Sequence, residues 1–122
     1  MRTDLDFPIA VSQMRPLPGN VRANTAAIIR DIRRAKAQGA AIIVFGELVT
    51  TGYLLGDRWE DDAFIRDVHD ANDRIRAATE GITACWGSVR ADWQRRNEDG
   101  RTRKYNAAVI ASDGAWVRNG VL

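Results

Sequence analysis

The 122-residue sequence contains one cysteine, one histidine and no long uninterrupted hydrophobic run. A single cysteine excludes a disulfide within the chain, and such a sequence suits a reducing compartment. The lone histidine, His69, has no second ligand at metal-binding spacing, so we expect no metal site and interpret His69 as a solvated helix residue. Because no apolar segment has the length of a signal peptide or a membrane span, we expect a cytoplasmic protein with no membrane partner.

Charge of one sign is not concentrated anywhere in the sequence. There are 18 lysines and arginines against 16 acidic residues, which gives a formal net charge of +2. The basic residues are scattered and are not interleaved with aromatics, which disfavours nucleic acid as a partner. We interpret the one short basic cluster, Arg101–Lys104, as a solvated turn. Hydrophobic residues make up 45% of the chain, enough for one globular domain or for part of a larger one.

The first half of the sequence predicts a strand, a helix and a second strand. The apolar segment 7–13 predicts a short strand that ends at a loop rich in proline and glycine. Asn20 can cap the following helix, and Gly39 supplies its end. The segment 40–47 is apolar on both faces, which is typical of a parallel strand covered by helices. One face of the helix carries four residues at helical spacing: Thr25, Ile28, Ile32 and Ala35.

A second amphipathic helix is predicted between the two halves of the chain. The acidic residues 60–62 stand at its start, where the helix macrodipole favours negative charge, and Gly81 ends it. Its apolar residues recur at helical intervals and predict one buried face: Phe64, Val68, Ala71, Ile75 and Ala78.

Strands and turns follow this helix. The segment 82–89 is apolar and predicts another buried strand. The segment 97–100, Asn-Glu-Asp-Gly, indicates a hairpin connection into a further strand at 105–111. A second turn signal, Asp113-Gly114, leads into Trp116. The whole pattern predicts an α/β fold.

A single carboxylate, Glu47, stands at the end of the most apolar predicted strand. Ligands of open α/β sheets bind at the carboxyl ends of strands. A carboxylate delivered to that edge is therefore a candidate general acid or base. The competing interpretation is a strand-end acid that forms an ion pair with a neighbouring arginine. Tyr53, in the turn that follows, either plugs the turn with its ring or lines a substrate pocket.

These segments resemble the amino-terminal third to half of the nitrilase superfamily, the carbon–nitrogen hydrolases. The resemblance rests on the order of elements, on the segment 45–48 (Phe-Gly-Glu-Leu) and on the segment 51–53 (Thr-Gly-Tyr). One departure is Gly46, which stands where the family usually has proline and loosens the strand end without removing the carboxylate. Further matching positions are Gln13, Gly19, Asn24, Ile28, Tyr105, Asn106, Ala107, Ala108, Asp113 and Gly114.

Within that superfamily, the sequence is most similar to the glutaminase domains of glutamine-dependent NAD synthetases. The positions that carry this narrower resemblance follow the Thr-Gly-Tyr turn: Gly56, Asp57, Trp59, Asp62, Ala63 and Phe64. The resemblance implies the first half of an α-β-β-α sandwich, with two helices on one face of a mixed sheet. Residues 1–122 would then be the amino-terminal portion of a hydrolase domain, and the other sheet face would pack on the remaining sheet.

The resemblance also implies a Glu-Lys-Cys triad in which Glu47 is the glutamate. A cysteine attacks the amide carbonyl, the glutamate moves protons between thiol, ammonia and water, and a lysine stabilises the oxyanion. Lys104 and Cys85 do not match the family's lysine and cysteine, which are expected beyond Leu122. Cys85 is instead interpreted as a core thiol. The 122-residue chain alone is therefore expected not to hydrolyse glutamine.

The same resemblance sets the expected substrate and partners. It implies glutamine as the amide substrate, bound near Tyr53, with glutamate and ammonia as products. No cofactor is expected for this domain, and ATP and Mg²⁺ only if a synthetase domain follows. We expect a homo-oligomer, or association with the remainder of the domain.

Two alternatives stay open at this stage. One is another amidase or carbamoylase of the superfamily, since Glu47 chemistry is common to all of them. The other is a noncatalytic, truncated module that acts by protein association through an uncovered apolar sheet face.

Overall fold

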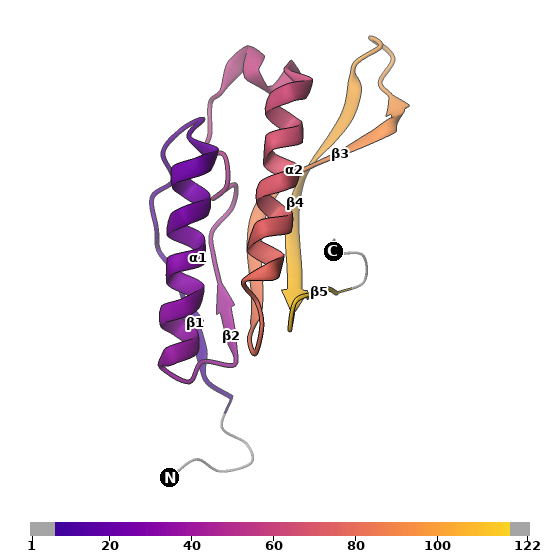
Figure 1. Cartoon of the computed structure of the whole chain (residues 1–122). Helices are drawn as coiled ribbons and strands as arrows, with labels where there is room; N and C mark the ends of the chain where they lie inside the picture. The colour runs from indigo at the N-terminus through magenta and orange to yellow at the C-terminus, as the bar shows by residue number, and fades with distance from the viewer. Residues whose placement is uncertain (1–6, 118–122) are drawn as a thin grey trace.

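The computed structural model describes residues 7–117, which form five strands, two α-helices and one short 3-10 helix (Figure 1). Along the chain the elements are β1 (Ile9–Val11), α1 (Val21–Ala37), β2 (Ile42–Val44), η1 (Gly56–Glu60), α2 (Asp62–Ala77), β3 (Thr83–Arg96), β4 (Thr102–Ser112) and β5 (Ala115–Trp116).

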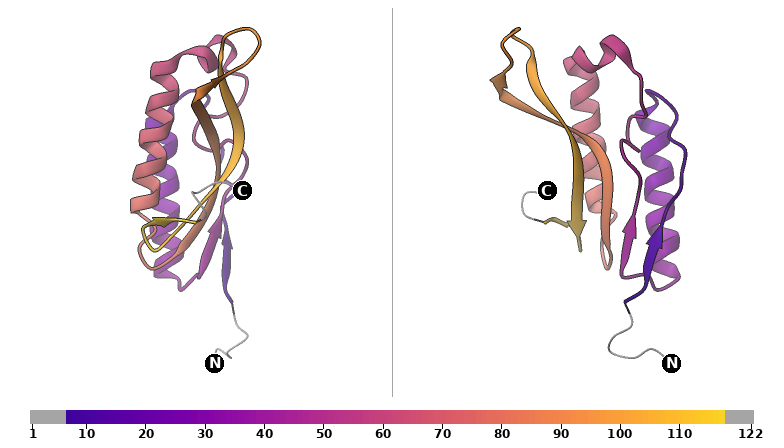
Figure 2. Two further views of the ribbon diagram at one scale, coloured as in Figure 1. Left: turned by 90° about the vertical axis from the view of Figure 1, so that its right-hand side faces the viewer. Right: turned by 180° about the vertical axis from the view of Figure 1, so that it is seen from behind.

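All five strands belong to one mixed sheet in the order β1-β2-β3-β4-β5. β2 lies parallel to both β1 and β3, whereas the pairs β3-β4 and β4-β5 are antiparallel. Both helices lie on the same side of the sheet, as the edge-on view in Figure 2 shows. The predicted α/β arrangement, a mixed sheet with two helices on one face, is therefore confirmed.

Strand alternation separates the two faces of this sheet. Ala84 is fully buried and lies opposite Ile43 in β2 and Ala111 in β4, and all three contribute to the core beneath the helices. The next residues along these strands point to the other face. They form a row across four strands, which we call the outer row: Val11, Val44, Cys85 and Ile110. Val11 is 69% exposed, so neither helix covers this face of the described structure.

The helices fold against the sheet because each has one apolar stripe. Ile28 and Ile32 of α1 and Ile75 of α2 have no exposed surface and belong to the same core cluster as the fully buried Trp86 of β3. The indole N–H of Trp86 donates to the side-chain oxygen of Asn72, 2.9 Å away, so the largest core side chain has its polar atom paired. Of the predicted core positions in α2, all except Ala78 are buried.

The starts of both helices and the end of α1 follow the predicted signals. The Asn20 side chain accepts from the Ala23 backbone N–H at 3.0 Å, and Asp61 caps α2 by accepting from Ala63 at 2.9 Å. Gly39 and Gly81 have φ angles of 84° and 74°, which L side chains rarely adopt. Gly39 follows Gln38, the C-cap of α1, whereas α2 already ends at Ala77, so the prediction that Gly81 ends the second helix is wrong.

The strand bounds differ from the prediction. β1 and β2 have three residues each, shorter than the predicted segments 7–13 and 40–47. Single backbone hydrogen bonds extend the pairing at Ser12 and Phe45, and the chain turns from Glu47 onward. β3 and β4 are longer than predicted. β3 continues to Arg96, and β4 begins at Thr102. Their outer halves carry more polar residues, of which Gln94 and Arg95 are exposed while Thr102 is buried.

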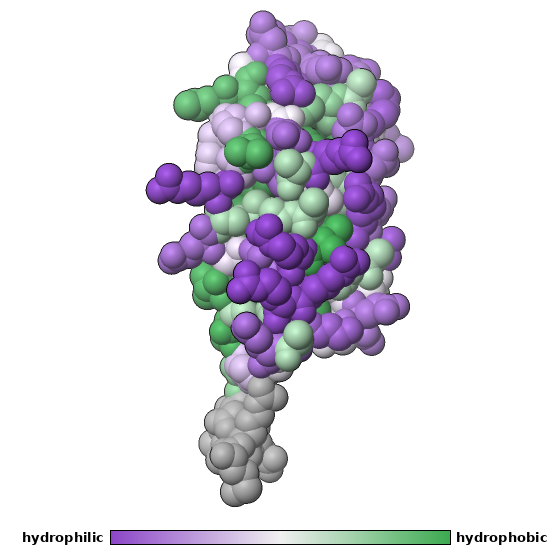
Figure 3. Space-filling view, turned by 60° about the vertical axis from the view of Figure 1, so that its left-hand side comes forward, coloured by the Kyte–Doolittle hydropathy of each residue, from purple (hydrophilic) through white to green (hydrophobic). Residues whose placement is uncertain are grey.

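The face shown in Figure 3 is largely hydrophilic, with separate hydrophobic patches, several of them along its left margin. Exposed arginines of α1, among them Arg30, Arg33 and Arg34, are the polar counterpart of its buried stripe. Neither α1 nor α2 is long and apolar enough to cross a membrane, and they are the only α-helices within residues 7–117.

The interpretation of His69 as a solvated residue is wrong. Its Nε2 accepts a hydrogen bond from the Ala91 backbone N–H at 3.1 Å, and its ring packs edge-on against Trp93. Burial lowers the pKa of His69 below the usual 6.5, and the nearby Arg90 adds to this, while Asp73 and Asp70 oppose it. His69 thus joins α2 to the outer half of β3 as a neutral imidazole.

His69 is expected to make stability depend on pH. Since its folded-state pKa is depressed, its contribution is fully present above 6.5 and is lost as pH falls below that value and the unfolded chain takes up a proton. The free energy of unfolding in urea, measured on both sides of this pH, should fall more in the wild type than in His69→Gln. Equal falls in the two proteins would contradict this role.

Candidate active site at the end of β2

Glu47 lies in a turn that continues directly from β2. The sheet pairing persists beyond β2. The Phe45 N–H donates to the Cys85 carbonyl at 2.9 Å, and the Gly87 N–H donates to the Gly46 carbonyl at 3.1 Å. Leu48, which follows Glu47, is buried and has a φ of 48°. This left-handed backbone conformation is uncommon for a residue with a side chain of this size. Backbone strain of this kind is found at functional sites where the surrounding structure imposes it.

Gly87 allows the Glu47 turn to lie directly against β3. A Cβ atom at position 87 would come within 2.4 Å of the Leu48 nitrogen and within 2.6 Å of the Glu47 Cα and the Gly46 oxygen. These neighbours are backbone atoms that cannot move aside independently. Only glycine permits this approach, so residue 87 determines how closely the Glu47 backbone can approach the sheet.

Asn24 holds the far end of the same turn. Its side chain is 2% exposed, accepts from the Leu17 N–H at 2.7 Å, and donates to the Leu17 and Thr50 carbonyls at 2.9 and 3.1 Å. The hydroxyls of Thr50 and Ser88, both fully buried, lie 2.8 Å apart and join the turn to β3. Helix α1, the proline-rich loop and β3 therefore fix the turn from three sides.

Two neutral donors hold the Glu47 carboxylate. The Tyr53 hydroxyl donates toward Oε2 at 3.2 Å and toward the Glu47 carbonyl at 3.1 Å, while Asn106 Nδ2 of β4 donates to Oε1. None of the arginines described in the structure forms an ion pair with Glu47, so the arginine-paired interpretation does not hold. Each oxygen is oriented by a neutral donor, and no cation within residues 7–117 forms an ion pair with it.

Tyr53 combines the two interpretations that its sequence position left open. The residue is 45% exposed and lines a cleft, while its hydroxyl closes the turn on Glu47. Burial raises the pKa of Tyr53 above 10.0, and the hydrogen bond to Glu47 and the charge of that carboxylate raise it further. The phenol is accordingly a donor to the carboxylate at neutral pH.

Two clefts meet at Asn106. The larger, of about 400 Å³, contains Tyr53 and Asn106 and is mostly apolar. The smaller, of about 280 Å³, contains Glu47, Asn106 and Cys85 and lies between the end of β2 and strands β3 and β4. The remaining residues of the larger cleft, which we call the Tyr53 cleft, are Leu48, Leu54, Trp59, Glu60, Val89, Lys104 and Tyr105.

Cys85 is not the core thiol that the sequence suggested. It belongs to the outer row and is only partly buried. Burial nevertheless raises the pKa of the Cys85 thiol above its usual 9.0, so it is mainly protonated at neutral pH. Its position next to Glu47 in the smaller cleft does not give it the low pKa expected of a nucleophile.

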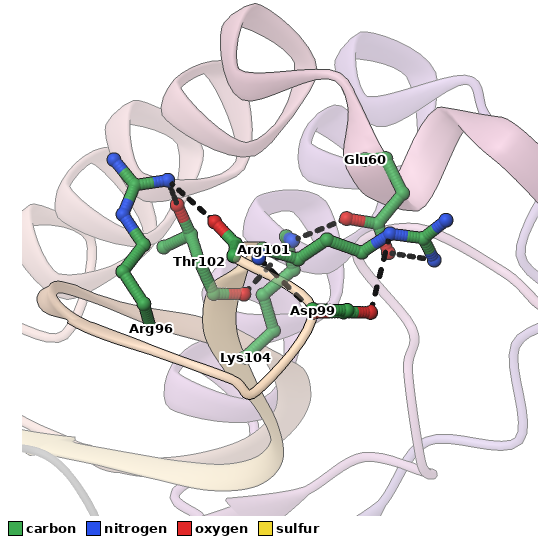
Figure 4. A network of polar contacts seen from close by, with 7 residues as sticks. Glu60, Arg96, Asp99, Arg101, Thr102 and Lys104 are labelled. Atoms are coloured by element: carbon green, nitrogen blue, oxygen red, sulfur yellow. Dashed lines mark hydrogen bonds and ion pairs between the residues drawn. The ribbon is translucent and has the colours of Figure 1, made fainter.

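The interpretation of Arg101–Lys104 as a solvated turn is wrong for its last members. Thr102 and Lys104 lie in β4, and the Lys104 side chain is 14% exposed. Figure 4 shows Lys104 and Arg101 converging on Glu60 of η1, with distances of 3.0 and 3.6 Å. Only Arg101, at 61% exposure, fits the predicted solvated character.

Sequence reasoning missed Asn106 and Gly87 as parts of the site. The sequence pattern marks Asn106 only as a matching position in the predicted strand 105–111, although a polar residue before Ala107 and Ala108 is a usable signal. Gly87 gave a weaker one, since a glycine inside an apolar strand indicates a close backbone approach. Within residues 7–117, histidine, cysteine and acidic side chains do not gather in groups of three that could hold a metal ion.

The helix layer, the mixed sheet and the carboxylate at the end of a parallel strand together define a structural class. The chain has an α/β fold of the nitrilase type, with a candidate site at the end of a parallel strand. An amidase of the nitrilase superfamily from Nesterenkonia matches it with a TM-score of 0.73 and 23% identity, over 91% of this chain and 40% of the amidase. Likeness at this identity shows the fold alone.

More particular relatives are glutamine-dependent NAD synthetases. The Acinetobacter baylyi enzyme is 28% identical over 108 residues, covering 88% of this chain but 18% of the relative. The structure of the Cytophaga hutchinsonii enzyme has a TM-score of 0.76 at 22% identity, covering 90% of this chain and 18% of that one. This chain thus spans less than a fifth of these two relatives, and no family model matches it.

Substituting Gly87 with alanine should displace the Glu47 turn. The added methyl group overlaps backbone atoms, and we expect a loss of about 1–3 kcal/mol in the free energy of unfolding, measured in urea. The matched control is Gly46→Ala, whose new Cβ would meet its nearest neighbour at an ordinary 3.8 Å and should change stability by less than about 1 kcal/mol. Equal effects of the two substitutions would refute the close-approach argument.

Neutralising Glu47 should lower the pKa of Tyr53. In Glu47→Gln the carboxylate charge is gone but burial remains, so the Tyr53 pKa should move toward 10.0 without reaching it. Tyrosinate absorbance in a Tyr105→Phe background reports Tyr53 alone, since the chain has two tyrosines. Glu60→Gln, which removes a different carboxylate of the same cleft, should leave the Tyr53 pKa in place. A drop in both variants would contradict direct coupling to Glu47.

Proposed function

We propose that this chain contributes the glutamate of a thiol-dependent amide hydrolase. The observation that carries the proposal is the Glu47 carboxylate, which is exposed between two clefts and is oriented by Tyr53 and Asn106, with no neutralising cation among the described residues. A carboxylate in this state can accept a proton, and a fixed orientation is what general base catalysis requires.

In the proposed reaction Glu47 takes the proton of a cysteine thiol as the sulfur attacks the amide carbon. The proton then passes to the departing nitrogen, and ammonia leaves. Glu47 next takes a proton from water, whose oxygen attacks the thioester carbon. The carboxylic acid is released and the sulfur recovers its proton. A lysine ammonium stabilises the negative oxygen of each tetrahedral intermediate.

The cysteine and the lysine are proposed to come from a part of the domain outside this chain. Cys85 has a raised pKa, and Lys104 pairs with Glu60 and not with the Glu47 site. Residues 1–122 would then be the amino-terminal portion of a hydrolase domain. The share of the relatives that the chain covers, 40% of the Nesterenkonia amidase, supports this proposal.

The relatives favour a cysteine nucleophile and glutamine as substrate. In one structure of the Nesterenkonia amidase the acetamide moiety of fluoroacetamide is attached covalently to the active-site cysteine. The sequence relatives are glutamine-dependent NAD synthetases, so we propose glutamine hydrolysis that supplies ammonia for NAD synthesis in the cytoplasm. This domain would use no cofactor, and ATP and Mg²⁺ would act only in an attached synthetase domain.

A noncatalytic role has one specific observation in its favour. The outer row, together with Ile9 at 61% exposure, leaves an apolar sheet face uncovered in the described structure. Such a face favours association, either with the remainder of a domain or with another copy. Another amide or carbamoyl substrate is also compatible with the Glu47 site, because its chemistry acts on the amide carbon and not on the rest of the molecule.

The proposal is tested by ammonia release. The purified 122-residue chain should release none from glutamine, and cysteine-dependent release would show that the missing groups are misassigned.

Past residue 122, we expect the coding sequence to supply a lysine within a few residues and a cysteine further on. In the polypeptide that carries all three groups, Glu47→Gln should lower kcat at least about 100-fold. Glu98→Gln, at the exposed tip of the β3-β4 hairpin, is the control and should retain full activity. An active Glu47→Gln enzyme would refute the proposal.

A further inference from the structure

The Tyr53 cleft has a pair of opposite charges in its wall. The Lys104 ammonium lies 3.0 Å from Glu60 Oε2 and donates to the Thr102 carbonyl at 3.1 Å, and both Lys104 and Glu60 line the cleft. In Figure 4 the two side chains reach toward each other from β4 and from the segment before α2. An ammonium has three N–H donors, and these two contacts use two of them.

The pair is built into the structure more firmly than an ordinary surface ion pair. Lys104 is 14% exposed, whereas Glu60 is 39% exposed and also faces Arg101 at 3.6 Å. Arg101 in turn pairs with Asp99 at 3.4 Å, so four charges of the cluster sum to zero. Arg101 does not line the cleft, which makes Lys104 and Glu60 the charged groups that a ligand there would meet.

The distance between Lys104 and Asn106 along β4 suits the length of a small amide that carries a charged end. Lys104 and Asn106 are two residues apart on one strand, so they point to the same face and their Cα atoms are separated by about 7 Å. The amide carbon and the carboxylate carbon of extended glutamine are about 5 Å apart from standard bond lengths. A ligand of this length can place its amide at Asn106 and its charged end at Lys104.

The walls between these two ends suit a short hydrocarbon chain. Leu48, Val89 and Trp59 line the cleft together with the Tyr53 ring, and its volume of about 400 Å³ lies within the range of small-molecule sites. Mostly apolar walls with a few polar groups at defined points are the usual composition of such sites.

We propose that the Tyr53 cleft binds the backbone end of a free α-amino acid whose side chain carries the amide. The α-carboxylate binds the Lys104 ammonium, the α-ammonium binds the Glu60 carboxylate, and the side-chain amide extends to Asn106 beside Glu47. This inference rests on the proposed function and adds to it a chemical basis for preferring an amino acid over a simple amide. A zwitterion leaves neither member of the ion pair with an unmatched charge.

The test is an NMR titration of the full 122-residue chain, which needs no catalytic activity. The reporters are the Trp59 indole N–H, the Tyr53 ring and the Asn106 side-chain amide. Four ligands dissect the cleft. L-Glutamine has all groups, L-norvaline lacks the amide, butyramide lacks both charges, and glutarate monoamide lacks only the ammonium. Glutamine should bind about tenfold tighter than butyramide, since hydrogen bonds to charged groups add that much or more.

Substitutions of Lys104 and Glu60 show which charged group of the ligand each of them binds. Lys104→Met keeps the apolar stem of the side chain and should reduce glutamine affinity toward that of butyramide, because the α-carboxylate loses its partner. Glu60→Gln should remove the preference for glutamine over glutarate monoamide. The matched control is Arg101→Met, which removes the other cation beside Glu60 but does not touch the cleft, and its affinities should equal those of the wild type. The four-ligand comparison in the wild type stands even if a variant fails to fold.

The titration distinguishes failure of the charged subsite from failure of the proposed amide hydrolysis. If butyramide shifts the Asn106 and Tyr53 signals and glutamine binds no tighter, the charged subsite is refuted while the amide site stands. If norvaline binds at Lys104 but no amide perturbs Asn106, the subsite is supported and the proposed amide chemistry fails. If glutamine and norvaline both leave Trp59 unshifted, the subsite is refuted.

Discussion

The close contact between Gly87 and the Glu47 turn is the constraint on which the site depends. Because β3 has no side chain at this position, the backbone of Phe45 and Gly46 continues the sheet pairing after β2 has ended, and the Glu47 Cα lies close against β3. The carboxylate is thereby brought within reach of Asn106, although β4 lies two strands away from β2. The rest of the site follows from this contact, including the left-handed Leu48 and the hydroxyl of Tyr53.

Glu47 is oriented by neutral groups, whereas the charged groups of the cleft are paired with each other. Tyr53 and Asn106 fix the two carboxylate oxygens, and Lys104 is occupied by Glu60. An ammonium on Glu47 would satisfy the carboxylate permanently and compete with proton transfer. The separation of these two sets of groups leaves one carboxylate for chemistry and one ion pair for recognition.

The layers and the strand-end carboxylate could be predicted from the sequence, whereas the partners of that carboxylate could not. Periodicity located α1 and α2, because Ile28, Ile32 and Ile75 must be buried together. Local patterns do not report contacts between distant residues, and Glu47 and Asn106 are 59 positions apart. His69 was misread for the same reason, since its acceptor role depends on Ala91, which β3 brings beside α2 only in the folded chain.

The raised pKa of Cys85 has a consequence for chemical labelling. Electrophiles such as haloacetamides react with thiolates, and burial keeps the Cys85 sulfur protonated at neutral pH. Cys85 should therefore alkylate slowly although the outer row leaves it partly accessible. In a polypeptide that carries a second, more acidic thiol beside Glu47, a limiting dose of such a reagent would mark that thiol first, and Cys85 would contribute little background.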